Sequence, residues 1–146
     1  MISSLQESSD AIRAAGLGAS TLLAAIAAIH VYWVAGGSWG TNAGLGGRDI
    51  DIHSVPWRIG TALIALGLVG AALVVVAKAD LLHVGVGTNI LTWATWVVAA
   101  GLLFGGVVNV FGRTWLERLG FAPLALGLGV LVTLVALSRL NEAGTS

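Results

Sequence analysis

The residues best suited to chemistry stand close together in one stretch, residues 30–40, which holds a histidine, a tyrosine, two tryptophans and three glycines. His30 lies inside a long apolar run, where an ionisable side chain is costly and is by default a candidate functional residue. Trp33 and Gly37 follow at the third and seventh positions, so a helix would place all three on one face. His30 is therefore a candidate for binding a ligand, handling a proton or holding a metal. The alternative is a neutral histidine near the membrane interface that is satisfied by one hydrogen bond.

Two residues further along the chain could complete a metal site with His30. Asp51 and His53 stand in the first polar connection, and two histidines with one carboxylate would suit a divalent metal. No metal motif of fixed spacing is present, and the sequence identifies no cofactor. A haem held between His30 and His83 is disfavoured, because these histidines fall at opposite ends of the expected bundle. The chain has no cysteine, which excludes disulfides, thiolate metal sites and cysteine nucleophiles.

A second group of candidate residues stands at the end of the third apolar run and in the connection after it. In a protein with four spans, the first and third connections lie at the same end of the bundle, so this group could meet the stretch 30–40. We therefore expect a pocket at that end for a lipid, an apolar small molecule or a partner helix. Its expected lining is His30, Tyr32, Trp33, Trp39, Asn109, Arg113 and Trp115.

Two classes of function fit these residues. The first is a non-enzymatic binding or accessory protein that uses the pocket. The second is a membrane enzyme, or a redox or metal-binding subunit, that uses His30 and His53. The sequence contains no Ser-His-Asp arrangement, no phosphate-binding loop and no pair of carboxylates inside an apolar run. An ion-coupled transporter usually carries an intramembrane carboxylate, so a transporter is disfavoured. Of the two classes, the binding or accessory protein is the expected one.

Four apolar runs must position these side chains. Hydrophobic residues make up 57% of the 146-residue chain and charged residues 10%, against roughly 25% charged in soluble domains. The mean hydropathy is +0.94, so the lipid bilayer is the expected surrounding. A net charge of zero argues against nucleic-acid binding. Runs of about 20 apolar residues can cross a membrane, and the expected spans are residues 14–35, 57–77, 84–110 and 120–137.

The predicted fold is an all-α, four-helix transmembrane bundle that forms a single domain over residues 1–146. Its first loop, residues 36–56, is long and rich in glycine. We expect this loop to fold back over the bundle end, so that Trp39 or His53 approaches the level of His30. The aromatic rings at that end offer a surface for the loop to cover.

Small residues at helical spacing are expected to bring the helices together. Gly101, Gly105 and Asn109 are four residues apart, so they share a face of the third helix. Close packing within the bundle is the first expectation, since glycine lets membrane helices approach each other. Homodimerisation, or contact with a partner membrane protein, through the same grooves is the alternative. Similar pairs in the second and fourth spans are Gly60 with Gly67 and Gly120 with Gly127.

Four spans place both termini on one side of the membrane. Basic residues number three on the terminus side and four on the loop side, so the positive-inside rule does not separate the two orientations. The α-amino group evens the count and tips the expectation toward cytoplasmic termini.

The pattern His-x-Tyr-Trp followed by Gly-Gly-x-Trp-Gly, at residues 30–40, resembles the first-helix signature of a family of small four-span bacterial membrane proteins of unknown function. Phe121-Ala122-Pro123-Leu124 is similar to the start of that family's last helix. Glu117 stands in the connection where the family tends to carry an aspartate. The resemblance implies a four-span fold in a bacterial inner membrane, and it implies no activity.

Overall fold

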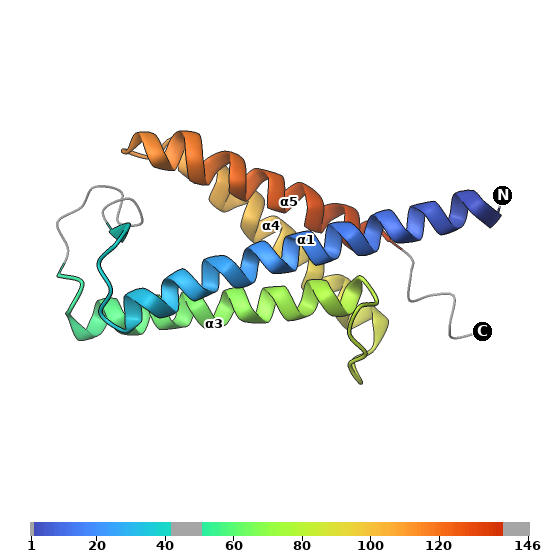
Figure 1. Cartoon of the computed structure of the whole chain (residues 1–146), viewed down its shortest axis with the longest axis horizontal. Helices are drawn as coiled ribbons and strands as arrows, with labels where there is room; N and C mark the ends of the chain where they lie inside the picture. Colours follow the sequence, from blue (N-terminus) through green and yellow to red (C-terminus); the bar gives the residue numbers. More distant parts are fainter. Residues whose placement is uncertain (1, 42–50, 139–146) are drawn as a thin grey trace.

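The computed structural model describes residues 2–41 and 51–138 of the chain. In these residues, four helices are long and apolar enough to cross a membrane. The all-α, four-helix transmembrane fold expected from the sequence is therefore confirmed, and the chain is a multi-pass membrane protein (Figure 1). In chain order the helices are α1 (Ile2–Val34), α3 (Val55–Lys78), α4 (Thr88–Val110), a short π-helix η1 (Glu117–Phe121) and α5 (Ala122–Leu137).

Helix α1 is longer than the first expected span. Its 33 residues correspond to about 50 Å at the rise of an α-helix, whereas the hydrocarbon core is about 30 Å thick. The excess lies at the N-terminus, where α1 projects beyond the other helices (Figure 1). The start of α1 and the end of α5 lie at the same end of the bundle (Figure 1). We call this the terminus end, and the opposite end, where α1 stops, the loop end.

Prolines mark the starts of two helices. Pro56 stands in the first turn of α3, where the missing N–H removes no helical hydrogen bond. Pro123 stands at the start of α5, which continues the helical backbone of η1. Helix α4 begins at Thr88, later than the expected start at residue 84, because residues 81–87 form an irregular connection instead of a helical turn.

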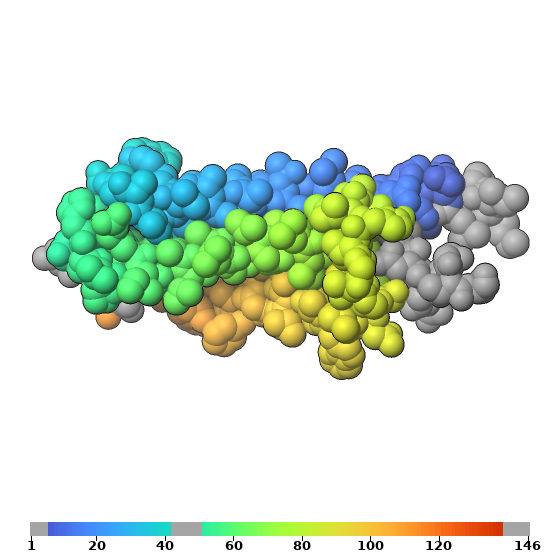
Figure 2. Space-filling view, turned by 90° about the horizontal axis from the view of Figure 1, so that it is seen from below, coloured from blue at the N-terminus to red at the C-terminus, as the bar shows by residue number. Residues whose placement is uncertain are grey.

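The four helices pack as two pairs. Helix α1 lies along α3 (Figure 2) and α4 lies along α5, and the two pairs meet where α1 contacts α5 and where α3 contacts α4. Figure 1 shows that the α4–α5 pair separates from α1 and α3 toward the loop end. The shared core therefore occupies the middle of the bundle and the terminus end. Its buried members are Ala19, Leu23, Ala72, Val75, Ala79, Ala99, Leu128, Val132 and Val135.

The glycines that pack between helices differ from those that the spacing suggested. Gly106 of α4 lies against Leu126 of α5, and Gly129 of α5 lies against Leu103 of α4. For five of the glycines that the spacing suggested, the expectation of packing within the bundle is wrong. A methyl group would meet nothing within 4 Å at Gly60, Gly67, Gly101, Gly105 or Gly127.

Helix rotation explains this correction. Successive residues of an α-helix are about 100° apart around the axis, so Gly105 faces away from the direction in which Gly106 packs. The buried positions of α4 are Leu91, Thr95, Ala99 and Gly106, and Gly101 lies outside that row. A methyl group on Gly120 would meet Leu116 of its own segment. Homodimerisation through the outward-facing glycines stays a prediction.

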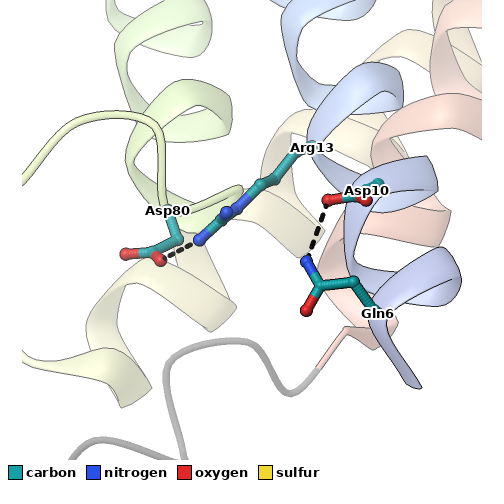
Figure 3. Close-up of polar contacts among 4 residues, drawn as sticks. All are labelled: Gln6, Asp10, Arg13 and Asp80. Atoms are coloured by element: carbon teal, nitrogen blue, oxygen red, sulfur yellow. Dashed lines mark hydrogen bonds and ion pairs between the residues drawn. The ribbon is translucent and has the colours of Figure 1, made fainter. Parts of the chain in front are cut away.

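At the terminus end, α1 is fastened to the connection after α3. Arg13 Nη2 lies 2.8 Å from Asp80 Oδ2, and this ion pair links two segments that are 67 residues apart (Figure 3). Close by, Gly16 allows the backbone of α1 to approach the side chain of Ala79. A half-exposed ion pair contributes little stability.

Candidate functional site

Helix α1 ends in a tight reversal that depends on two glycines. Gly36 has a φ of 101°, a left-handed conformation that favours glycine, and its N–H donates to the carbonyl of Trp33. The N–H of Gly37 donates to the carbonyl of Tyr32 over 3.0 Å. Any side chain on Gly37 would collide with the Tyr32 ring. The glycine pair therefore turns the chain back toward the aromatic residues of the last helical turn.

Two hydrogen bonds hold the returning chain against α1. The indole Nε1 of Trp33 donates to the carbonyl of Trp39 over 2.8 Å. The backbone N–H of Trp39 donates to the Tyr32 hydroxyl over 3.4 Å. Trp33 is buried, whereas the Trp39 ring is 75% exposed. Trp39 thus returns to the level of Tyr32 and Trp33, and the remainder of this expected fold-back, residues 42–50, lies outside the described residues.

The reversal creates an apolar pocket on the surface of α1. It has a volume of about 450 Å³ and is lined by Ala28, Ile29, Tyr32 and Trp39. It is an open depression on the helix surface and not an enclosed cavity. Ala28 and Ile29 were not among the residues that sequence reasoning selected. Their positions four and three residues before Tyr32 place them on its helix face, and that spacing is the signal that could have identified them.

The pocket faces away from the bundle. Leu23 and Ala27 of α1 are buried, and helical periodicity places them roughly opposite Tyr32 on the helix circumference. Ile29 and Tyr32 are both more than a third exposed. The pocket therefore opens on the outer face of α1 at the loop end.

His30 lies on a different face from the pocket. Its Nδ1 is 2.8 Å from the carbonyl of Ile26, one turn earlier in the same helix. Its ring stands 4.9 Å from the Trp33 ring, centroid to centroid, at a tilt of 59°. The described contacts of His30 thus match a histidine that is satisfied by one hydrogen bond. Its ring packs against the ring of Trp33.

Asn109, Arg113 and Trp115 belong to a different part of the loop end. Asn109 is in the last turn of α4, and its carbonyl accepts the N–H of Gly112 over 3.0 Å. Arg113 and Trp115 follow in the link to η1 and are exposed. Because the α4–α5 pair separates from α1 at this end (Figure 1), these three residues are not brought to the pocket lining. A ligand-binding role for them stays a prediction.

The link between α4 and α5 is organised by a capping box. The Glu117 carboxylate accepts hydrogen bonds from the N–H and hydroxyl of Thr114, and the Thr114 hydroxyl accepts the N–H of Glu117. The sequence signal is Thr114 followed by glutamate three residues later. Arg118 Nε adds a 2.6 Å bond to the carbonyl of Gly112. These contacts are structural, and they explain Glu117 as a helix-starting residue.

His53 and Asp51 are exposed at the start of α3. Asp51 Oδ1 accepts the backbone N–H of His53 over 2.9 Å, which forms a local turn before the helix. Within residues 2–41 and 51–138, no group of three or more His, Cys, Asp or Glu side chains could hold a metal ion. His30, Asp51 and His53 are therefore not assembled into a site in this part of the chain.

Comparison with known proteins adds a family and no activity. Neither a curated protein nor a solved structure matches the sequence. One family model matches residues 23–132, a range that includes both residues 30–40 and residues 121–124. The match does not test the His-x-Tyr-Trp signature or the bacterial origin, which stay predictions. Because the match covers well over half of the chain, this protein belongs to DUF3995, a family of proteins of unknown function.

Proposed function

We propose that this protein is a non-enzymatic binding or accessory protein of the bilayer, and that its loop-end pocket binds a linear apolar chain such as a lipid acyl chain. The observation that carries the proposal is the pocket of about 450 Å³ between Ala28, Ile29, Tyr32 and Trp39. Its lining is almost entirely apolar, and it opens on the face of α1 that points toward lipid. A lipid tail is the apolar molecule present at the highest concentration there.

Hydrogen bonds hold the backbone beside the pocket in place, which favours a binding site over an incidental groove. Both backbone polar groups of Trp39 are engaged, the carbonyl by Trp33 and the N–H by Tyr32. These bonds fix the backbone of Trp39, so the ligand does not need to order that part of the chain. A pre-organised site loses less conformational entropy on binding and so retains more of its contact energy.

Photocrosslinking tests this proposal. The purified protein, reconstituted in vesicles, is labelled with a phospholipid that carries a diazirine on its acyl chain, and the labelled peptides are identified by mass spectrometry. We expect labelling of the segment from Ala28 to Trp39 that saturates and is competed by unlabelled lipid. Ala28→Trp should lower this labelling several-fold, because the indole fills the pocket. Leu17→Trp is the matched control, since Leu17 is exposed on α1 outside the pocket.

The two variants separate the proposal from its alternatives. Equal labelling of Ala28→Trp and the control would mean that lipid contacts α1 only as a general solvent, and the lipid-binding proposal would fail. A partner helix seated in the pocket would instead give protein–protein cross-links and little labelling by lipid.

As part of the same proposal, the protein lies in the inner membrane of a bacterium with its termini on the cytoplasmic side. The absence of cysteine permits labelling of single introduced thiols. Glu7→Cys in the exposed start of α1 and His53→Cys in the first connection should react with a membrane-impermeant maleimide from opposite sides. In intact spheroplasts, we expect only the His53→Cys variant to react. Reaction of the Glu7→Cys variant alone would reverse the orientation.

A further inference from the structure

The connection between α3 and α4 exposes an apolar surface, although the charged residues Lys78 and Asp80 stand at the junction with α3. Residues 81–87 contain one ionisable side chain, His83, and two glycines. The four remaining side chains are all apolar and each is between 39% and 43% exposed: Leu81, Leu82, Val84 and Val86. A run of exposed leucine and valine side chains in water would be unfavourable, since each adds apolar area to solvent.

The charged residues before this segment are turned away from its outer surface. Lys78, the last residue of α3, is only 1% exposed. Asp80 is paired with Arg13 of α1 at 2.8 Å (Figure 3). Asp80 also has a φ of 56°, a left-handed conformation that ends α3 and reverses the chain.

The segment also lies where the bilayer surface is expected. It projects sideways from the bundle at the end of α3 and does not extend beyond the N-terminal part of α1 (Figure 1), and Figure 2 shows it on the outer surface. Its apolar surface continues into the first turns of α4, where Ile90 and Trp93 are 65% and 74% exposed. Trp93 is a residue type that prefers the headgroup level. The lipid-facing surface of α4 and the segment are therefore continuous.

We propose that residues 81–87 are an interfacial anchor, which inserts Leu81, Leu82, Val84 and Val86 into the boundary between headgroups and acyl chains of the same bilayer. Apolar side chains on a surface segment bind this boundary in proportion to the area they bury. His83 would lie among the headgroups, where its ring can remain hydrated. In the described chain, the terminus-end half of α4 carries Trp93 and Trp96, and the anchor adds apolar area at that same end.

Spin labelling of the reconstituted full-length protein tests the anchor. Single-cysteine variants Val84→Cys, Phe104→Cys and His53→Cys carry a nitroxide in vesicles of phosphatidylcholine and phosphatidylglycerol. Phe104 is 72% exposed in the middle of α4 and reports the hydrocarbon, and His53 is exposed in the first connection and reports water. The quantity compared is the ratio of collisions with oxygen to collisions with a water-soluble nickel chelate. We expect this ratio at Val84 to be several-fold higher than the ratio at His53 and lower than the ratio at Phe104.

Two results would overturn the proposal. A ratio at Val84 equal to that at His53 would place the segment in water. Low collision rates with both reagents at Val84 would mean that a second copy or a partner protein covers it. Melting of the three labelled variants is compared with that of the unlabelled chain, so that a misfolded sample is recognised. All three positions are exposed, so the labels fit without displacing the core.

Discussion

Gly106→Leu is expected to lower the thermal stability of the detergent-solubilised protein, and Gly105→Leu is expected to leave it nearly unchanged. A side chain on Gly106 would stand 2.7 Å from Cγ and 3.0 Å from the backbone nitrogen of Leu126. The backbone of α5 cannot yield without separating the helices, so we expect a loss of about 1–3 kcal/mol, the usual effect of overpacking. A Cβ atom added at Gly105 meets nothing within 4 Å.

The measurement is the midpoint of thermal unfolding, followed by circular dichroism, for both variants and the parent chain. The two substitutions add the same side chain to adjacent residues of one helix, so differences in helix propensity largely cancel. An equal fall for both variants would mean that Gly105 is also enclosed, for example by a second copy of the chain. No fall at Gly106 would contradict the packing of α4 against α5.

Gly105 and Gly106 also show that the sequence predicts the spans but not the rotation of each helix about its axis. Hydropathy identifies the apolar runs, because the thickness of hydrocarbon fixes the length of a span. The same uniform hydropathy hides the rotation of each helix, since a membrane helix can be apolar on every face. Gly101 and Gly105 have the spacing of a packing face, yet Gly106 is the residue that meets α5. Which face packs depends on side chains of the partner helix, such as Leu126, that spacing within α4 does not reveal.

The candidate site divides in a similar way. The glycine and aromatic residues of residues 30–40 carry a local signal, because the reversal and its hydrogen bonds form within eleven residues of chain. Ala28 and Ile29 carry no such signal, since alanine and isoleucine are ordinary members of an apolar run. The sequence predicts that Asn109 lies near His30, because both precede connections at one end of the bundle. Their separation follows from the divergence of the helix pairs (Figure 1), a tertiary property with no local signature.

Gly37→Ala is expected to lower lipid labelling of the pocket several-fold with little change in thermal stability. A methyl group on Gly37 would occupy the space of the Tyr32 ring. The backbone of Gly37 is in an ordinary conformation, so alanine introduces no strain in φ. The collision involves the far end of a flexible and half-exposed side chain, so Tyr32 can rotate away. Its departure removes one of the four walls of the pocket and the acceptor of the Trp39 N–H.

The matched control is Gly18→Ala, which adds the same methyl group to α1 where nothing lies within 4 Å. Photocrosslinking with the diazirine phospholipid is compared between the two variants and the parent chain. We expect a several-fold loss of labelling between Ala28 and Trp39 for Gly37→Ala and parental labelling for the control. Parental labelling of Gly37→Ala would show that the Tyr32 ring does not form the binding surface, because the ring cannot keep its place beside an alanine. A large fall in its melting midpoint would instead mean that the reversal at residues 36–40 holds the bundle together, and the glycine pair would then serve stability as well as the pocket.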